Sequence, residues 1–217
     1  MEPHDSQPRA QWAYSASDPS PRAYDRYAEE RDRKGLDPRK LPYVQEAVRL
    51  FRANGTRSIL EIGSGPGNAA EVFHDGGLDI ECADVSPVMV DLVRSKGIRG
   101  HVIDCRQLRR LERTYDRVLS VNCLLHIPSQ ELPDVLEAIS DVLNEKGLFV
   151  LGLWGGQDSE GVWEGDHYEP KRYFVLYSQQ TPLSLLTQVL QIEEYRRFEF
   201  GEGQFFHKVV LRRTPRA

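Results

Sequence analysis

The segment ILEIGSGPGN, residues 59–68, constrains the fold of this chain more than any other. Its aliphatic residues predict a short buried strand, and three glycines at alternate positions follow it directly: Gly63, Gly65 and Gly67. Because glycine has no Cβ, the backbone can turn sharply there and a ligand can approach it closely. We expect a helix after the last glycine, with free N–H groups at its start that favour a negatively charged ligand group. The alternative is a tight strand-to-helix turn without a ligand.

Strand-like and helix-like segments alternate after this turn, which predicts βαβ units and a mostly parallel α/β sheet. Strands are expected at 79–84, 99–104, 115–122 and 148–154, and helices at 68–77, 86–97, 129–147 and 181–190. The chain then ends in two strand-like segments, 191–200 and 204–213. Three residues separate them, which is the spacing of an antiparallel hairpin.

The chain divides into two parts by composition. Residues 1–38 form an N-terminal segment, which we expect to be mobile to about residue 22 and to contain a charged cap helix at 23–35. Residues 39–217 form the main domain. Within it, the stretch 155–180 is long, aromatic and acidic, and we expect it to be a loop that acts as a substrate lid.

Composition argues against several classes of function. The net charge is −5, and no long block of Lys or Arg indicates a partner nucleic acid. Three cysteines without paired spacing argue against a disulfide framework, and no His or Cys cluster suggests a metal. No apolar run reaches the roughly 20 residues of a membrane span, and the N-terminus lacks a signal-peptide core. We therefore expect a cytoplasmic protein, monomeric or homodimeric, without a membrane partner.

An acidic residue ends the strand that follows the glycine turn. Asp84 occupies the position from which a carboxylate can accept hydrogen bonds from both hydroxyls of a ribose. The alternative role is to cap the next helix. Ser86 already takes that place, with Pro87 in the first turn, so the ribose role is favoured.

Five segments in order resemble the successive motifs of class I S-adenosylmethionine-dependent methyltransferases: ILEIGSGPGN, ADVSPVMV, HVIDCRQL, YDRVLSVNCLLHIP and LNEKGLFVL. The similarity covers roughly residues 40–213. It implies a Rossmann-like, seven-stranded, mostly parallel sheet with a C-terminal antiparallel hairpin, helices on both faces, and S-adenosyl-L-methionine as cofactor. The sequence departs from the family at NEKG, residues 144–147, where Pro-Gly-Gly is usual.

The resemblance also assigns residues to the cofactor. Glu61 would hold the methionyl amino group through a water, and Asp84 would take the ribose hydroxyls. Asp104 would accept from the adenine amino group. The remaining contacts would come from the glycine turn with Gly63, Ser64, Gly65 and Gly67, and from the adenine-facing side chain of Val85. Backbone groups at Cys105, Val121 and Asn122 and the closing ring of Tyr27 complete the set.

His126 is the candidate general base. It follows a predicted strand at the carboxyl edge of the sheet, where ligands bind in such folds, and its side chain ionises near neutral pH. The alternative is a histidine that only orients the substrate or caps the next helix. His167 and Tyr168 are further candidates for the base.

Aromatic and acidic residues predict where an acceptor binds. Tyr24 resembles the tyrosines that close over the cofactor in related enzymes, and Trp163, His167 and Tyr168 lie in the long insertion. Together with the acidic residues of the insertion, Glu160, Glu164 and Asp166, they favour a cationic or amphipathic small molecule. The alternative is a solvated loop that the aromatic residues anchor.

The resemblance implies transfer of a methyl group to an O, N or S atom of a small molecule, within specialised metabolism. The alternatives are a non-catalytic S-adenosylmethionine-binding protein, a nicotinamide-dependent reductase and a methyltransferase that acts on macromolecules. GSGPG in place of GxGxxG disfavours the reductase. The net charge, and NCLLH in place of an N/D-P-P-Y signature, disfavour a nucleic-acid substrate.

Overall fold

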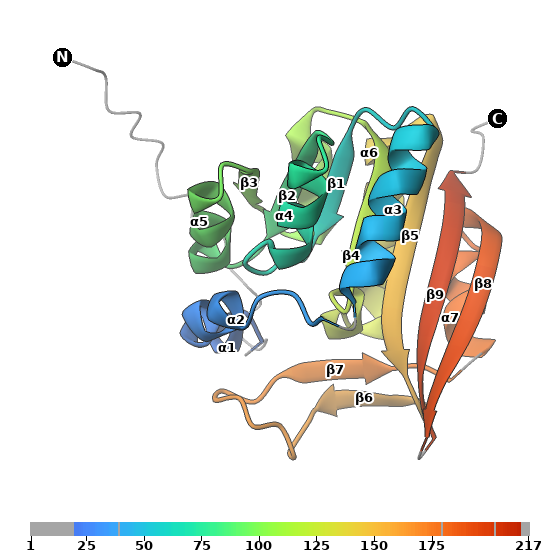
Figure 1. Cartoon of the computed structure of the whole chain (residues 1–217). Coiled ribbons are helices and arrows are strands. Elements are labelled where there is room, and N and C mark those ends of the chain that lie inside the picture. The colour runs from blue at the N-terminus through green and yellow to red at the C-terminus, as the bar shows by residue number, and fades with distance from the viewer. Residues whose placement is uncertain (1–19, 39, 179, 202, 214–217) are drawn as a thin grey trace.

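The computed structural model describes residues 20–38, 40–178, 180–201 and 203–213. Its main sheet has seven strands: β1 (Ile59–Ile62), β2 (Ile80–Asp84), β3 (Arg99–Val102), β4 (Tyr115–Val121), β5 (Leu143–Gly155), β8 (Leu190–Gly201) and β9 (Gln204–Arg213). They lie in the order β3-β2-β1-β4-β5-β9-β8 (Figure 1). The first five pair in parallel, and β9 is antiparallel to both of its neighbours. This confirms the predicted fold and its closing hairpin.

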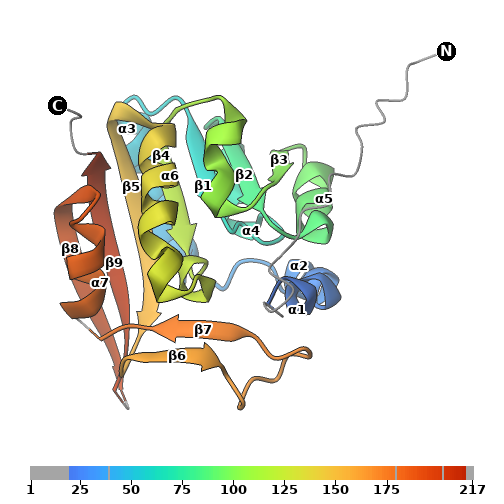
Figure 2. The same ribbon diagram turned by 180° about the vertical axis from the view of Figure 1, so that it is seen from behind.

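Helices cover both faces of this sheet (Figures 1 and 2). One face carries α3 (Leu41–Ala53), α4 (Asn68–Asp75) and α5 (Pro87–Ser95), and the other carries α6 (Leu132–Val142) and α7 (Gln180–Leu186). Successive strand residues point to opposite faces. Ile59 therefore packs in the first layer and Leu60 in the second. Within the described ranges, no helix combines the length and apolar character that crossing a bilayer requires.

A smaller group of elements lies beyond the carboxyl ends of the parallel strands (Figure 1). It consists of α1 (Ser20–Arg26), α2 (Ala28–Lys34) and an antiparallel ribbon of β6 (Ser159–Val162) with β7 (Tyr173–Leu176). We call α1, α2 and residues 159–176 the cap. Because it lies at this edge, the cap covers the site described below.

The cap departs from the sequence predictions in three ways. The helix expected at 23–35 is broken at Tyr27, whose ring stacks on Tyr168 from the insertion. Residues 20–22, expected to be mobile, belong to α1, where Ser20 and Pro21 are buried. The insertion, expected to be a loop, forms the β6–β7 ribbon because Val175 of β7 and Tyr177 just after it are buried against the core.

The helix predicted at 129–147 is also shorter than expected. Ser129–Glu131 form a separate 3₁₀ turn, and α6 ends at Val142. Leu143 instead pairs with Tyr115 of β4, so that the NEKG segment belongs to β5, with an irregularity in register before Arg117 pairs with Leu148.

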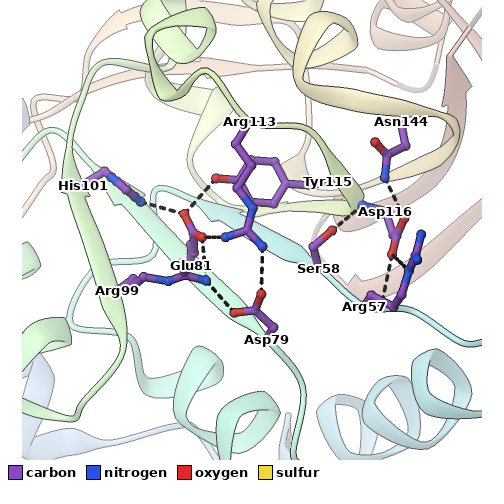
Figure 3. A network of polar contacts seen from close by, with 10 residues as sticks. All are labelled: Arg57, Ser58, Asp79, Glu81, Arg99, His101, Arg113, Tyr115, Asp116 and Asn144. Carbon is purple, nitrogen blue, oxygen red and sulfur yellow. Dashed lines mark hydrogen bonds and ion pairs between the residues drawn. The ribbon is translucent and has the colours of Figure 1, made fainter.

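A network of charged side chains joins the amino ends of the strands (Figure 3). Glu81 of β2 is only 3% exposed, and its carboxylate accepts hydrogen bonds from Tyr115 at 2.9 Å and from His101 at 2.8 Å. It also pairs with Arg113 and, at 2.9 Å, with Arg99. Both arginines reach Asp79 as well. A buried carboxylate is tolerated here because every partner is a donor or a cation.

Replacing Arg113 with alanine tests this network. We expect Arg113→Ala to lower the free energy of unfolding by about 2–3 kcal/mol, because it withdraws one cation from a buried carboxylate while Arg99 remains. Urea denaturation measures the change. The control Arg110→Ala, on the exposed side of the neighbouring turn, should change the free energy by less than about 0.5 kcal/mol. Equal losses in the two variants would contradict a stabilising role for the network.

Candidate active site

A cavity of about 470 Å³ lies at the carboxyl ends of the parallel strands, between the sheet and the cap. Open α/β sheets bind ligands at this edge, and the volume is typical of small-molecule sites. Eight residues predicted to bind the cofactor line it: Gly63, Gly65, Asp84, Val85, Asp104, Cys105, Val121 and Asn122. The candidate base His126 and two predicted acceptor residues, Tyr24 and Trp163, also line it.

Other predicted residues lie outside the cavity wall. Four belonged to the expected cofactor site: Tyr27, Glu61, Ser64 and Gly67. Tyr168 is buried, with its ring stacked on Tyr27 at 4.3 Å between centroids. The side chain of His167 is 77% exposed. The structure therefore brings His126 and Tyr24 together and leaves His167 apart.

The glycine turn needs its glycines for two different reasons. All three have positive φ, at +65° for Gly63, +56° for Gly65 and +78° for Gly67, which favours glycine. A Cβ at Gly63 would also lie 2.3 Å from the Cβ and Sγ atoms of Cys123. A Cβ at Gly65 would meet nothing within 4 Å, because this residue faces the cavity.

The amides of the glycine turn itself already have acceptors. The Gly63 and Ser64 amides both donate to the Ala83 carbonyl of β2, and Gly67 donates to Ser64. The Gly65 amide donates to Asp84 Oδ2 at 2.9 Å. The end of β2 thus supplies acceptors that the sequence pattern of the turn does not reveal. The free N–H groups were expected at the start of the following helix, which begins at Asn68.

Asp84 is held in place by two backbone donors. Its Oδ2 accepts from Gly65 and its Oδ1 accepts from the Ser86 amide, also at 2.9 Å. Burial raises the pKa of this carboxyl group, and the two hydrogen bonds act in the opposite direction. A carboxylate offers about four acceptor positions, so each oxygen can still accept from a ligand hydroxyl. As predicted, Ser86 caps α5 by accepting from the Met89 amide.

Glu61 carries a buried polar atom that lacks a partner. Its side chain is 7% exposed, and among the described residues no hydrogen-bond donor reaches Oε2. Burial first, and the nearby Asp84 charge second, raise the pKa of Glu61 to about 7. An ammonium group from a ligand, directly or through a water, would supply the missing donor. Glu61 therefore fits the role assigned to it.

Asp104 is already engaged by its neighbour. Its carboxylate caps the 3₁₀ turn that begins at Cys105 and accepts from the Arg106 amide and Nε, each at 2.8 Å. Burial opposes ionisation, but the hydrogen bonds from Arg106 outweigh it and lower the pKa of Asp104. The carboxylate is thus ionised at the cavity wall, where it can accept from a donor such as an exocyclic amino group.

The carboxylates of the insertion do not line the cavity. Glu160 accepts from Ser129 and Tyr173, Glu164 pairs with Lys171, and Asp166 pairs with Arg172. The prediction of a cationic acceptor depended on these acids, so it loses its support. No cluster of three or more His, Cys, Asp or Glu that could hold a metal occurs in the part of the chain that the structure describes.

Hydrogen bonds across the cavity wall join the cap to His126. The Tyr24 hydroxyl lies 2.7 Å from His126 Nε2, and His126 Nδ1 lies 2.6 Å from the Tyr173 carbonyl. Arg172 donates from Nη1 to the Tyr24 oxygen at 3.0 Å. Arg172 was missed by sequence reasoning. It is adjacent to Tyr24 only because the insertion folds as a ribbon over α1.

Residues 59–147 match a family model described as a methyltransferase domain. They contain the glycine turn, Asp84, Asp104 and His126. The match therefore assigns a methyltransferase domain to this part of the chain. No curated protein sequence matches the chain.

Solved structures share the fold of this chain. A S-adenosylmethionine-dependent methyltransferase from Clostridium acetobutylicum has a TM-score of 0.67 at 16% identity, with 88% of this chain and 99% of that one covered. N-methyltransferase NodS from Bradyrhizobium japonicum, in complex with S-adenosylhomocysteine, has a TM-score of 0.67 at 15% identity over 91% and 100%.

A third structure holds both of its ligands. The 1,6-didemethyltoxoflavin-N1-methyltransferase from Burkholderia thailandensis, with bound 1,6-didemethyltoxoflavin and S-adenosylhomocysteine, has a TM-score of 0.61 at 17% identity, covering 99% of this chain and 100% of that one. In this chain, the buried Glu61 oxygen and the Asp84 carboxylate are chemically suited to hold S-adenosylmethionine, the cofactor that the sequence resemblance implies.

The Glu61→Gln variant separates binding from stability. With a pKa of about 7 in the folded chain against 4.5 ordinarily, Glu61 lowers stability as the pH rises from about 5 to 7, because the folded state retains the proton. Without cofactor, the variant should lose this part of the pH dependence and become more stable than the wild type at pH 8. It should also bind S-adenosylmethionine more weakly.

Thermal denaturation across pH and calorimetric titration with S-adenosylmethionine measure both effects. The exposed Glu145→Gln is the matched control and should behave as the wild type does in both assays. Unchanged cofactor affinity and an unchanged pH profile in Glu61→Gln would contradict the assignment of Glu61 to the cofactor site.

Proposed function

We propose that the methyltransferase transfers its methyl group to an O, N or S atom of a small-molecule acceptor bound beneath the cap. The observation that supports this most strongly is the cap over the cavity. The Tyr173 amide donates to the Ser20 hydroxyl at 2.9 Å, and Tyr24 meets His126 at 2.7 Å, so α1 and β7 lie together across the site. The volume of about 470 Å³ is typical of small-molecule sites.

The chain's own residues would act mainly by positioning. S-adenosylmethionine, when bound, supplies a methyl group activated by its sulfonium, so the protein's task is to align an acceptor atom with it. Alignment alone can lower the barrier by roughly 7–11 kcal/mol. Asp84 and Glu61 would hold one reactant, while aromatic side chains on the cavity wall, Trp163 and Phe174 among them, would pack against the other.

An acceptor that carries a proton must lose it, and we propose that His126 receives it. The Tyr173 carbonyl can only accept, so Nδ1 carries the hydrogen and Nε2 of the neutral ring is the acceptor. In the structure, Nε2 is in contact with the Tyr24 hydroxyl. A proton from the acceptor therefore reaches His126 through the Tyr24 oxygen.

The names of two structural neighbours also favour a small acceptor. NodS is named as an N-methyltransferase, and the Burkholderia enzyme holds 1,6-didemethyltoxoflavin, a small heterocycle. Those names describe the neighbours. For this chain, they support the class of acceptor that the cavity beneath the cap already favours.

Radiolabelled S-adenosylmethionine distinguishes the two acceptor classes. The full chain is incubated with the labelled cofactor and either an ultrafiltrate of a cell extract or the macromolecules retained by the filter. We expect label in the ultrafiltrate, in compounds that can then be purified and identified. Incorporation confined to the retained protein or nucleic acid would contradict the proposal.

The acceptor found in this way allows a test of the base. We expect His126→Ala to lower turnover about a hundredfold or more, because a positioned base contributes that much, with little change in cofactor affinity. Tyr24→Phe should give a similar loss. The exposed His74→Ala on α4 is the control and should retain full turnover. Turnover of His126→Ala equal to that of the control would exclude His126 as the base.

A further inference from the structure

Hydrogen bonds to a buried carboxylate fix the position of Arg172 at the cavity wall. The residue is 8% exposed and immediately precedes β7. Asp166, whose side chain is fully buried, accepts from Arg172 Nε at 2.7 Å and from Nη2 at 2.9 Å. The same carboxylate accepts from the backbone amides of Arg172 and Tyr168. Such two-pronged pairs fix both distance and orientation.

The remaining guanidinium nitrogen is directed at Tyr24. Arg172 Nη1 donates to the Tyr24 oxygen at 3.0 Å, and the guanidinium carbon lies 5.3 Å from the centre of the tyrosine ring. An arginine can only donate, and at the other end the Tyr173 carbonyl can only accept. His126 Nδ1 therefore donates to the Tyr173 carbonyl, which leaves Nε2 of the neutral ring as an acceptor. The Tyr24 hydroxyl donates to this Nε2, while the Tyr24 oxygen accepts from Arg172.

We propose that Arg172, clamped by Asp166, is a positioning residue that directs the Tyr24 hydroxyl toward His126 and stabilises negative charge on the Tyr24 oxygen while a proton passes. This inference rests on the proposed function, since it concerns how the same site removes the acceptor's proton. It assigns a role to a pair of residues, Arg172 and Asp166, that the sequence did not predict to bind the cofactor or to act as the base.

The proton balance of the step is simple. The bond between the acceptor atom and its hydrogen breaks, and that hydrogen binds the Tyr24 oxygen. The original hydroxyl hydrogen of Tyr24 moves to His126 Nε2, which becomes an imidazolium while Nδ1 stays bound to the Tyr173 carbonyl. The acceptor keeps its electron pair for the new bond to carbon. Arg172 gains and loses no proton.

The charges around Tyr24 show why an arginine matters there. Besides Arg172 and His126, Arg31 of α2 lies over the Tyr24 ring and donates to the hydroxyl of Tyr168, which also packs against Tyr24. Burial raises the pKa of the Tyr24 phenol, and the charges of Arg172 and Arg31 act against that rise. Without them, charge on this oxygen would be strongly disfavoured.

Arg31 offers a matched control. Its guanidinium carbon lies 5.2 Å from the Tyr24 ring centre, almost the same distance as that of Arg172. Only Arg172 donates a hydrogen bond to the Tyr24 oxygen. Removing either arginine removes one positive charge beside the ring, but Arg172→Gln also removes the hydrogen bond to the Tyr24 oxygen, so we expect the larger effect from Arg172.

The experiment places a fluorinated tyrosine at position 24 of the full chain. Fluorination lets the phenol ionise at a pH where the chain stays folded, and ¹⁹F NMR follows that single site without cofactor or acceptor. We expect Arg172→Gln to raise the apparent pKa by about one unit, a tenfold change in the ionisation equilibrium, because a donor and a charge are lost together. Arg31→Gln should raise it by less than half as much.

Equal shifts in the two variants, or none in Arg172→Gln, would overturn the proposal. If Arg172→Gln does not fold, Arg172→Lys keeps the charge and loses the forked geometry. It should still raise the pKa above that of the wild type, and a wild-type value would overturn the proposal. Because the titration uses neither cofactor nor acceptor, its failure leaves methyl transfer intact. Failure of the radiolabel experiment would, in turn, leave the measured pKa shifts of Tyr24 unaffected.

Discussion

The hydrogen bond from the Gly65 amide to Asp84 is the contact on which the rest of the site depends. It joins the glycine turn after β1 to the end of β2, and the second oxygen of Asp84 accepts from Ser86 at the start of α5. One half-buried carboxylate therefore fixes the turn, the neighbouring strand and a helix relative to one another. The same carboxylate faces the cavity, so the group that we propose binds ligand hydroxyls is positioned before any ligand arrives.

The site combines rigid positioning with an unfavourable charge. Glu61 is buried and Asp84 is half-buried, the pKa values of both carboxyl groups are raised, and one oxygen of Glu61 lacks a donor among the described residues. A fold that needed only stability would place an apolar side chain at Glu61. The cap covers this region through contacts that are far apart in sequence, such as Asp25 with Ser86 and Tyr24 with His126. The ligand-binding role proposed for Glu61 accounts for the cost.

Local patterns made the sheet and most residues at the cavity predictable. The glycine turn follows β1, Asp84 ends β2 and Asp104 lies two residues past β3, and parallel strands end at a common edge. The cap was less predictable, because the pairing of β6 with β7 and the contact of Arg172 with Tyr24, 148 residues apart, depend on tertiary packing. The hydrogen bonds of the turn were not predictable for the same reason, since the acceptors Ala83 and Asp84 come from the adjacent strand.

The most direct test of this arrangement is a crystal structure of the full chain with S-adenosylhomocysteine. We expect the ribose hydroxyls within hydrogen-bond distance of Asp84, and the amino group joined to the unpartnered oxygen of Glu61, directly or through one water. A ligand bound elsewhere, or a ribose that makes no contact with Asp84, would contradict the assignment of the glycine turn and Asp84 as the cofactor site.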